Sequence, residues 1–104
     1  MFYMKEISVE ALKAKLDNRE DFIFIDVREP YEYEEFNLGA RLIPLGEIMD
    51  NLHLLDGHKN DEIIVHCRSG KRSGMAVDIL NQAGFTNVTN VKGGVLRWQE
   101  VFPA

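Results

Sequence analysis

The sequence predicts an α/β fold with a mostly parallel sheet and helices on both faces. Short apolar segments alternate with segments of helical periodicity along the chain of 104 residues. The strongest apolar runs, Phe22-Ile23-Phe24-Ile25 and Ile63-Ile64-Val65, contain no alternating polar residues. Such runs are typical of strands that are covered on both faces, as in parallel sheets. Binding sites in these folds lie at the carboxyl ends of the strands, so the residues after each strand are the first site candidates.

The first thirty residues predict an edge strand, a helix and a central strand. Residues 2–7 lean apolar and would form the short edge strand. Ser8 is a suitable N-cap for a helix that continues to Leu16, because apolar residues recur there on one face. The run at 22–25 is the first central strand, and it ends at Asp26-Val27-Arg28-Glu29.

The next segment predicts two helices around a short strand. Pro30 fits the first position of a short helix that runs to Phe36. A loop at 37–40 leads to a strand at 42–43, which the following proline stops. A second helix is expected over 45–55, with its apolar face inward. That face comprises Ile48, Leu52 and Leu55.

The last forty or so residues predict two strands and two helices. A strand at 62–66 leads through a short loop into a helix that ends near Ala83, with Gly84 as its C-terminal cap. The last strand covers 88–91, and a final short helix covers 95–102. The core candidates of this final helix are Leu96 and Trp98.

Composition favours one ordinary globular domain over residues 1–104. Apolar residues make up 45% of the chain and charged residues 28%, and no repeat or linker interrupts it. The net charge of −5 argues against partners such as nucleic acid or an anionic membrane. The N-terminal residues lack an apolar segment long enough for a signal peptide or a membrane helix, so we expect a cytoplasmic location.

The chain has one cysteine, Cys67, and three histidines. A single cysteine excludes an internal disulfide, CxxC redox chemistry and a cysteine-rich zinc site within one chain. The histidines, His53, His58 and His66, lack the spacing of metal ligands. We therefore expect no metal and no cofactor, and a free thiol that suits a reducing compartment.

Cys67 lies between an apolar strand and a helix, in a loop of small and cationic residues. An ordinary cysteine has a pKa of about 8.5, and the thiolate is its nucleophilic form. A helix N-terminus near Arg72 or Ser73, the cations and a curled loop of backbone N–H groups would all lower this pKa. Gly70 can adopt the positive φ that such a curl requires. The candidate site residues are Cys67, Arg68, Ser69, Gly70, Lys71, Arg72 and Ser73.

Two interpretations compete for this thiol, a reactive one and a buried, inert one. Cys67 ends an apolar strand, which is common for a small buried hydrophobe. The polar and cationic residues after it favour an exposed, reactive thiol instead. Lys71 and Arg72 oppose the helix dipole at a helix start, and such a local violation marks a candidate anion site. The alternative is an ordinary solvated loop, although three cations within five residues weaken it.

Three residues near the strand ends have structural interpretations. His66 precedes Cys67 on a strand, so the two side chains point to opposite faces. We therefore expect His66 to pack or to hydrogen-bond rather than to act as a base. Asp26 and Arg28 form either the rim of the site or a structural ion pair, for instance Arg28 with Glu32 one helical turn away. We favour the ion pair.

The number of residues between Cys67 and Arg72 narrows the range of groups that the loop can bind. Protein-tyrosine and dual-specificity phosphatases clasp phosphate with a cysteine, five residues and an arginine. Here Arg72 follows after only four residues, and Ser73 occupies the position of that arginine. The shorter cradle fits a smaller group than phosphate, such as one additional sulfur atom on the thiolate.

The chain resembles a single-domain rhodanese, the family of persulfide-forming sulfurtransferases, over nearly its whole length. The matching motifs are Asp26-Val27-Arg28-Glu29, Ile43-Pro44-Leu45, the loop 67–73, Ala83-Gly84-Phe85, and Gly93-Gly94 with Trp98. The resemblance implies a five-stranded parallel sheet and a ping-pong reaction through a persulfide on Cys67. It implies thiosulfate or another persulfide, including one on a protein, as donor and cyanide or a thiol as acceptor.

The same resemblance implies roles for the loop residues. Cys67 is the implied nucleophile, the backbone of 68–73 the implied nest, and the cationic side chains the implied holders of the donor's anionic end. The chain departs from the family at 36–40, which lacks the usual glycine and histidine and is one residue shorter. A sulfur carrier or partner-binding module would use the same persulfide, whereas the loop length disfavours a phosphatase.

Overall fold

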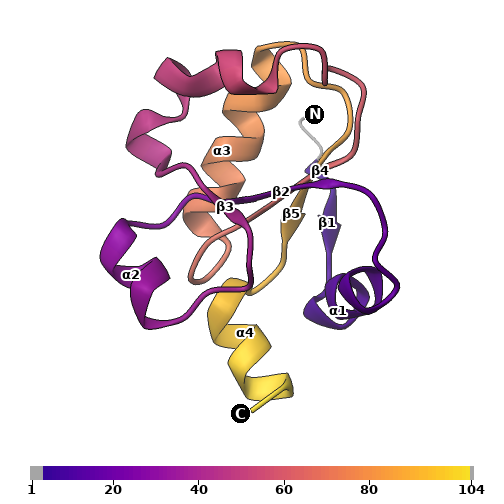
Figure 1. The fold of residues 1–104 in the computed structure, drawn as a ribbon, viewed down its shortest axis with the longest axis vertical. Helices are drawn as coiled ribbons and strands as arrows, with labels where there is room; N and C mark the ends of the chain where they lie inside the picture. Colours follow the sequence, from indigo (N-terminus) through magenta and orange to yellow (C-terminus); the bar gives the residue numbers. More distant parts are fainter. Residues whose placement is uncertain (1–3, 104) are drawn as a thin grey trace.

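The computed structural model describes residues 4–103 and contains a five-stranded parallel sheet (Figure 1). The strand order is β1-β5-β4-β2-β3, and each neighbouring pair is parallel. The strands are β1 (Glu6–Ile7), β2 (Ile23–Asp26), β3 (Arg41–Leu42), β4 (Ile63–His66) and β5 (Val88–Val91). The α/β class predicted from the sequence is therefore confirmed.

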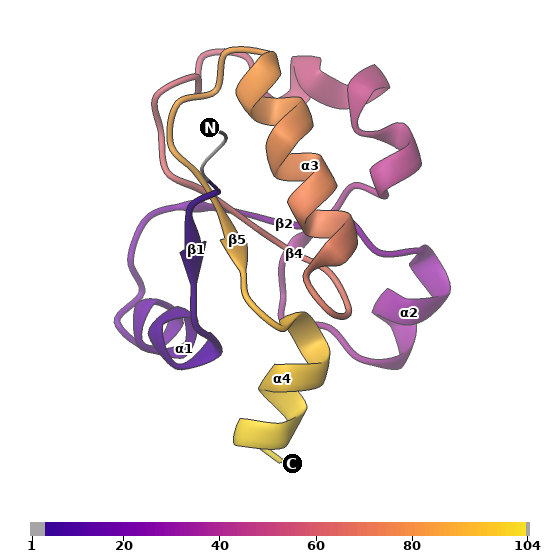
Figure 2. The ribbon, with the colours of Figure 1, turned by 180° about the vertical axis from the view of Figure 1, so that it is seen from behind.

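Helices cover both faces of the sheet. Within the described residues the α-helices are α1 (Val9–Asp17), α2 (Pro30–Glu35), α3 (Lys71–Gln82) and α4 (Gly94–Val101), and the 3-10 helices are η1 (Leu45–Glu47) and η2 (Met49–Leu55). Figures 1 and 2 show α3 and the 3-10 helices on one side of the sheet, with α1 and α4 on the other. No helix in this part of the chain has the length and apolar character needed to cross a membrane.

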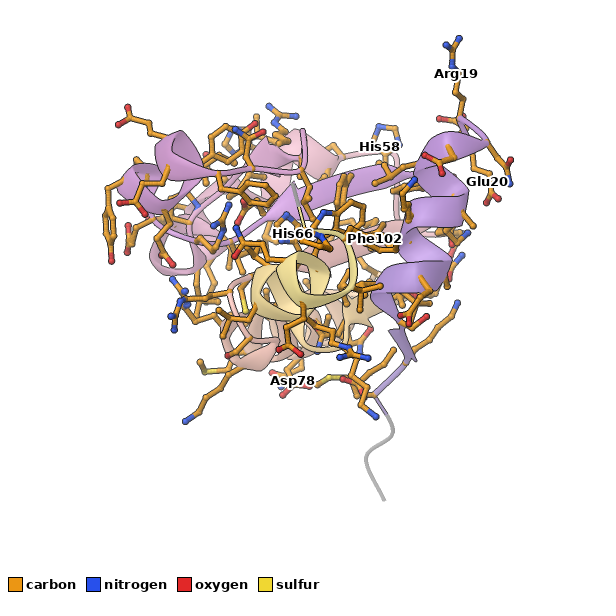
Figure 3. All side chains as sticks on the ribbon, turned by 90° about the horizontal axis from the view of Figure 1, so that it is seen from below. Arg19, Glu20, His58, His66, Asp78 and Phe102 are labelled. Carbon is orange, nitrogen blue, oxygen red and sulfur yellow. The ribbon has the colours of Figure 1, made fainter. Side chains whose placement is uncertain are left out.

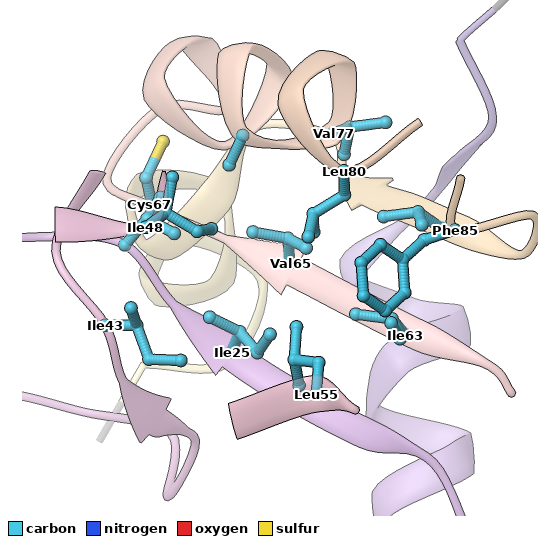
Figure 4. Close-up of a cluster of buried hydrophobic side chains, with 13 residues drawn as sticks. Ile25, Ile43, Ile48, Leu55, Ile63, Val65, Cys67, Val77, Leu80 and Phe85 are labelled. Carbon is cyan, nitrogen blue, oxygen red and sulfur yellow. The ribbon is translucent and has the colours of Figure 1, made fainter. Parts of the chain in front are cut away.

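Two apolar clusters fill the layers on either side of the sheet. The larger cluster lies between the sheet and α3 with the 3-10 helices, and it includes Ile25, Val65 and Leu80 (Figure 4). The smaller cluster lies between the sheet and α1 with α4, and it includes Leu12 and Ile64. Ile64 and Val65 are neighbours in β4 but belong to opposite clusters, which explains why residues 63–65 of this strand are all apolar.

Most element boundaries follow local signals in the sequence. The hydroxyl of Ser8 caps α1 by accepting a backbone hydrogen bond of 3.0 Å. Pro30 is the first residue of α2, and Gly84 follows the end of α3 with a φ of 96°. The edge strand expected at 2–7 is present as β1 at its last two residues, and residues 2 and 3 lie outside the described part.

The prediction of a single helix over 45–55 is wrong, because this segment forms η1 and η2 instead. Their backbone hydrogen bonds join residues three apart, as between the N–H of Asn51 and the carbonyl of Ile48 at 3.1 Å. Gly46 has a low helix propensity, and the Asn51 side chain donates to the carbonyl of Glu47 at 2.7 Å. That side chain therefore competes with the backbone for an acceptor that a regular helix would use.

Two smaller expectations also need correction. Leu96 was expected in the core but is 38% exposed, whereas Trp98 of the same helix packs against the smaller cluster. Residues two apart on a helix point in nearly opposite directions, so only one of them can face the sheet. The strand expected at 42–43 is shifted by one residue in β3, although the N–H of Ile43 still donates to the carbonyl of Asp26 at 2.9 Å.

The order of the strands brings two of the predicted strand ends together. β2 and β4 are neighbours in the sheet, and Asp26 lies opposite His66 in their register. The segment after β2 and the cysteine loop after β4 therefore meet at the same carboxyl edge, the expected place for a site.

Candidate functional site

Cys67 is the first residue after β4, and a tight loop connects it to α3. The helix begins at Lys71, one residue before the expected start, and Gly70 is its N-cap. Gly70 has a φ of 99°, the positive value that the curled loop requires. A Cβ atom on Gly70 would lie 3.4 Å from the backbone nitrogen of Gly93, so the loop is also close to its neighbour. This conformation turns the chain back over the sulfur.

The loop directs three hydrogen-bond donors at the sulfur of Cys67. The backbone nitrogen of Gly70 lies 3.1 Å from Sγ, and the backbone nitrogen and hydroxyl oxygen of Ser73 each lie 3.3 Å from it. Burial raises the pKa of the thiol, but hydrogen bonds from Ser73, Gly70 and Ser69 outweigh burial and lower the pKa below its ordinary value. The nest of backbone N–H groups expected from the sequence is present.

The thiol is less accessible than its polar neighbours in the sequence indicated. Cys67 is 1% exposed, which corrects the expectation of an exposed thiol. Figure 4 shows Cys67 within the larger apolar cluster, with its sulfur directed toward the start of α3. The loop itself covers the sulfur while it donates hydrogen bonds to it. Cys67 is thus a core residue by packing and a candidate nucleophile by its hydrogen bonds.

The start of α4 fixes the cysteine loop from the other side. The N–H of Val95 donates to the carbonyl of Cys67 at 3.0 Å, and that of Leu96 donates to the carbonyl of Arg68 at 2.9 Å. A Cβ atom on Gly94 would lie 2.5 Å from the carbonyl oxygen of Cys67, so only glycine allows this approach. From the sequence alone, Gly94 was identified only as part of a glycine pair in a family motif, and this role was missed. The only available signal was the glycine pair directly after the last strand.

The three cations of the loop have different partners. The guanidinium of Arg72 binds the carboxylate of Glu32 in α2 through two hydrogen bonds of 2.7 and 2.9 Å. The bonds to Arg72 lower the pKa of Glu32 to about 2. Arg68 and Lys71, by contrast, form no ion pair with any residue from 4 to 103. Two cations are therefore available to a ligand, and the third already holds a carboxylate.

Asp26 and Arg28 form a buried ion pair at the end of β2. Nη2 of Arg28 lies 2.8 Å from Oδ2 of Asp26 and also donates to the carbonyl of Phe36 at 2.7 Å. The expected structural ion pair is present, but the suggested partner, Glu32, is wrong. Arg28 reaches only the backbone carbonyl of Glu32, at 3.4 Å, because the carboxylate is bound to Arg72. The pair joins α2 and the following loop to the sheet.

His66 is buried and packs as expected from its place on the strand. Its ring lies 5.2 Å from that of Phe24, and Figure 3 shows it inside the molecule, away from Arg19 at the periphery. Nδ1 lies 3.4 Å from the carbonyl oxygen of Cys67 rather than near the sulfur. Burial lowers the pKa of His66, although the Asp26 carboxylate opposes this shift. The ring therefore stays neutral and is not placed to act as a base for Cys67.

The divergent segment at 36–40 forms a closed loop next to α2. The hydroxyl of Tyr33 donates to the carbonyl of Ala40 at 2.8 Å, and the N–H of Gly39 donates to the Asn37 side chain at 3.0 Å. A pocket of about 160 Å³ lies near the start of this loop, between α2 and α4, with Arg68 in its wall. No cluster of histidine, cysteine or acidic side chains within residues 4–103 is arranged to hold a metal ion.

Residues 8–101 match a family model described as a rhodanese-like domain. The chain belongs to the rhodanese-like domain family. A Bacillus subtilis (strain 168) protein provisionally named sulfur carrier protein YrkF is 44% identical to this rhodanese-like domain over 94 residues. The match covers 89% of this chain and 50% of YrkF, so the domain spans half the length of that relative.

The matches to two further relatives of this rhodanese-like domain cover a larger share of each relative than the match to YrkF does. Thiosulfate sulfurtransferase PspE of Escherichia coli (strain K12) is 39% identical over 71 residues, which are 67% of this chain and 68% of PspE. The crystal structure of a rhodanese-like domain protein from Staphylococcus aureus matches with a TM-score of 0.82 and 34% identity over 91% of each chain. The family recognised from the sequence motifs is therefore confirmed, together with the five-stranded parallel sheet that it implied.

Proposed function

We propose that this rhodanese-like domain transfers sulfane sulfur through a persulfide on Cys67. The observation that carries the proposal is the set of donors from Gly70 and Ser73 that converge on Sγ. Such donors stabilise the thiolate, and in the loaded protein the loop would stabilise the charge of the persulfide. The name of PspE, a thiosulfate sulfurtransferase, supports the same chemistry for this chain.

The reaction consists of two displacement steps. The thiolate of Cys67 attacks the outer sulfur of thiosulfate, the S–S bond of thiosulfate breaks, and sulfite leaves with the bonding electron pair. An acceptor such as cyanide then attacks the outer sulfur of the persulfide, which yields thiocyanate and regenerates the thiolate. Neither step needs a proton to move once the thiol is ionised. The requirement is therefore a low pKa of Cys67, in agreement with the direction of its shift.

The anionic end of the donor is assigned to Arg68 and Lys71. These two cations flank the loop and have no carboxylate partner among the described residues. Arg72, which the family resemblance placed in the same role, is bound to Glu32 and would have to leave it to bind a donor. We therefore propose that Arg72 acts mainly by holding α2 beside the loop, while Ser69 contributes its backbone N–H to the nest.

Intact mass spectrometry after incubation with thiosulfate tests the proposal. We expect a gain of one sulfur atom per chain, which cyanide or dithiothreitol removes and which Cys67→Ser does not show. The assignment is unambiguous because the chain has a single cysteine. If neither thiosulfate nor a protein persulfide adds sulfur to the wild-type chain, sulfur transfer is not its function.

A sulfur carrier that serves a protein partner is the second candidate. Cys67 is 1% exposed, which restricts free access of small molecules, and the relative YrkF carries the name of a sulfur carrier. A carrier would discharge faster to a protein thiol than to cyanide, whereas a thiosulfate:cyanide sulfurtransferase would turn over rapidly with cyanide alone. Hydrolysis of an aryl phosphate that depends on Cys67 would instead favour the phosphatase interpretation.

A further inference from the structure

Asn90 of β5 lies behind the cysteine loop and contacts it in two places. The residue is 3% exposed, and its Oδ1 lies 2.5 Å from Oγ of Ser73. Its Nδ2 lies 3.1 Å from the carbonyl oxygen of Gly70 and 3.2 Å from Oε2 of Glu6 in β1. Oγ of Ser73 in turn lies 3.3 Å from Sγ of Cys67. A series of hydrogen bonds thus runs from Glu6 at the sheet edge to the thiol, and its last three members, Asn90, Ser73 and Cys67, are buried.

The acceptors around Asn90 determine how its amide is oriented. The carbonyl oxygen of Gly70 and the carboxylate of Glu6 only accept hydrogen bonds, so Nδ2 must face them. Oδ1 therefore faces Ser73, and it too can only accept. While the thiol is neutral, the single hydroxyl hydrogen of Ser73 therefore points to Asn90, and Ser73 presents a lone pair to Cys67. Donation from this hydroxyl to Sγ, the third contact of the loop with the sulfur, is then left for the thiolate. The S–H of a neutral thiol can donate to that lone pair. The side chains of Cys67, Ser73 and Asn90 then all have hydrogen-bond partners.

We propose that Asn90 is a positioning residue that directs the Ser73 hydroxyl and thereby limits the thiolate fraction of Cys67. When the thiol ionises, Ser73 has to turn its hydrogen from Oδ1 of Asn90 to Sγ. The buried amide oxygen of Asn90 then loses its partner, which costs free energy. The backbone N–H groups of the loop favour ionisation, and the Ser73–Asn90 pair opposes part of that effect. This role matters for sulfur uptake only if the proposed function holds, whereas the ionisation of Cys67 can be measured without it.

Several charged groups lie near the neutral hydrogen-bonded pair of Ser73 and Asn90, which we call the Ser73–Asn90 relay. Arg68 adjoins Cys67 in the loop. The pKa of Arg72 in α3 is raised chiefly by its hydrogen bonds to Glu32 of α2, and the charge of Cys67 adds to this shift. Glu6 contributes a carboxylate from β1. A neutral replacement of Asn90 leaves all of these charges in place, so a change in ionisation reports the relay.

The test uses two replacements of Asn90 and a control on the same strand. Asn90→Leu removes the amide at similar size, and Asn90→Ala removes it without adding apolar volume. Thr89→Val is the matched control, because Thr89 is equally buried and its hydroxyl has no hydrogen-bond partner within residues 4–103. Its side chain points to the other face of the sheet, as neighbouring strand residues do.

Ultraviolet absorbance of the thiolate, recorded against pH, reports the ionisation of Cys67. Subtraction of the Cys67→Ser titration removes the contribution of the tyrosines, and the single cysteine makes the remainder specific. We expect either Asn90 variant to increase the acid dissociation constant of the thiol by about tenfold. Thr89→Val should leave the constant unchanged. A decreased or unchanged constant in both Asn90 variants would overturn the proposal.

Titration in a Ser73→Ala background distinguishes an effect of Asn90 on the direction of the Ser73 hydroxyl hydrogen from a general effect of Asn90 on the structure of the loop. Ser73→Ala alone should decrease the dissociation constant, because the thiolate loses a donor. Adding Asn90→Leu to Ser73→Ala should cause no further change, since no hydroxyl remains to be directed. A residue that merely shaped the loop would shift the constant equally in both backgrounds, and that result rules out the relay. This titration contains no sulfur donor, so a failure of sulfur loading would count against the proposed function alone.

Discussion

At the scale of single residues, the hydrogen bonds to Cys67 matter more than the full charges around it. Burial disfavours the thiolate, yet the pKa of Cys67 is lowered, and the groups that lower it are the hydroxyl and N–H donors of the loop. The nearest guanidinium in α3, that of Arg72, already binds Glu32. The loop therefore acts through its backbone conformation, which makes the glycines that permit this conformation as important as the cations.

Gly94 is the residue at which one added carbon atom should disturb the loop most. It has a φ of 57°, and a Cβ atom would lie 2.5 Å from the carbonyl oxygen of Cys67 and 2.6 Å from that of Arg68. Both contacts are with backbone atoms, so Gly94→Ala has to displace α4 or the loop. We expect the free energy of unfolding to fall by about 2–4 kcal/mol in urea denaturation. Sulfur loading, followed by mass spectrometry, should slow as well.

Gly46→Ala is the matched control for this substitution. Apart from its own neighbours along the chain, no atom of residues 4–103 lies within 4 Å of the Cβ that it would add, and Gly46 does not have a positive φ. Its effect on the free energy of unfolding should stay within about 1 kcal/mol. Equal stability of the two alanine variants would contradict the close approach of α4 to the cysteine loop.

At the scale of elements, α2 is held beside the site by polar contacts rather than by an apolar face. The helix contains no buried residue. Arg28, which follows the end of β2, donates to the carbonyl of Phe36, and Arg72 reaches from α3 to the carboxylate of Glu32. The position of α2 relative to the cysteine loop therefore depends on the charge of Glu32.

Glu32→Gln should destabilise the protein at neutral pH but not in acid. The pKa of Glu32 is lowered from 4.5 to about 2, chiefly by its hydrogen bonds to Arg72. A carboxylate with a depressed folded pKa stabilises the fold above its unfolded value of 4.5, and this contribution disappears as the pH falls toward 2. We expect a loss of about 1–2 kcal/mol at pH 7 in urea denaturation, since the Arg72 side chain remains partly solvated.

The exposed pair of Arg97 and Glu100 provides the control for this pH dependence. Its nitrogen–oxygen distance is 3.2 Å, but both side chains are at least half exposed, so solvent screens the attraction. Glu100→Gln should leave the free energy of unfolding unchanged at every pH. If Glu32→Gln behaves in the same way, the contact with Arg72 does not hold α2 in place.

At the scale of the whole molecule, local patterns predicted the scaffold, and the strand order supplied the contacts that they could not predict. The apolar runs, the cap at Ser8 and a single cysteine after a strand are all local features, and they located the fold class and the loop. The bonds from Arg72 to Glu32 and from Ser73 to Asn90 join residues 40 and 17 positions apart. They exist because β5 lies beside β4, and β2 on its other side, an order that apolar runs do not encode.

Ionisation of Cys67 should link the site to the stability of the entire fold. The pKa of the thiol is lowered in the folded protein below its ordinary value. The extra stability is therefore complete above the unfolded pKa and is lost as the pH falls through the folded one. The wild type should gain free energy of unfolding relative to Cys67→Ser as the pH rises from the folded pKa toward the unfolded one, measured by urea denaturation under reducing conditions. A tenfold change in the dissociation constant corresponds to about 1.4 kcal/mol, which this method resolves.

The Asn90 variants sharpen this last measurement. If Asn90 restrains ionisation through Ser73, then Asn90→Leu lowers the folded pKa further and should enlarge the gain in free energy between neutral pH and the unfolded pKa of the thiol. The loss of the contacts to Gly70 and Glu6 lowers stability at every pH, so it shifts the curve without changing its slope. A slope that equals that of the wild type would remove Asn90 from the control of the thiol. A flat difference between wild type and Cys67→Ser would mean that the loop holds the thiolate no better than the unfolded chain does.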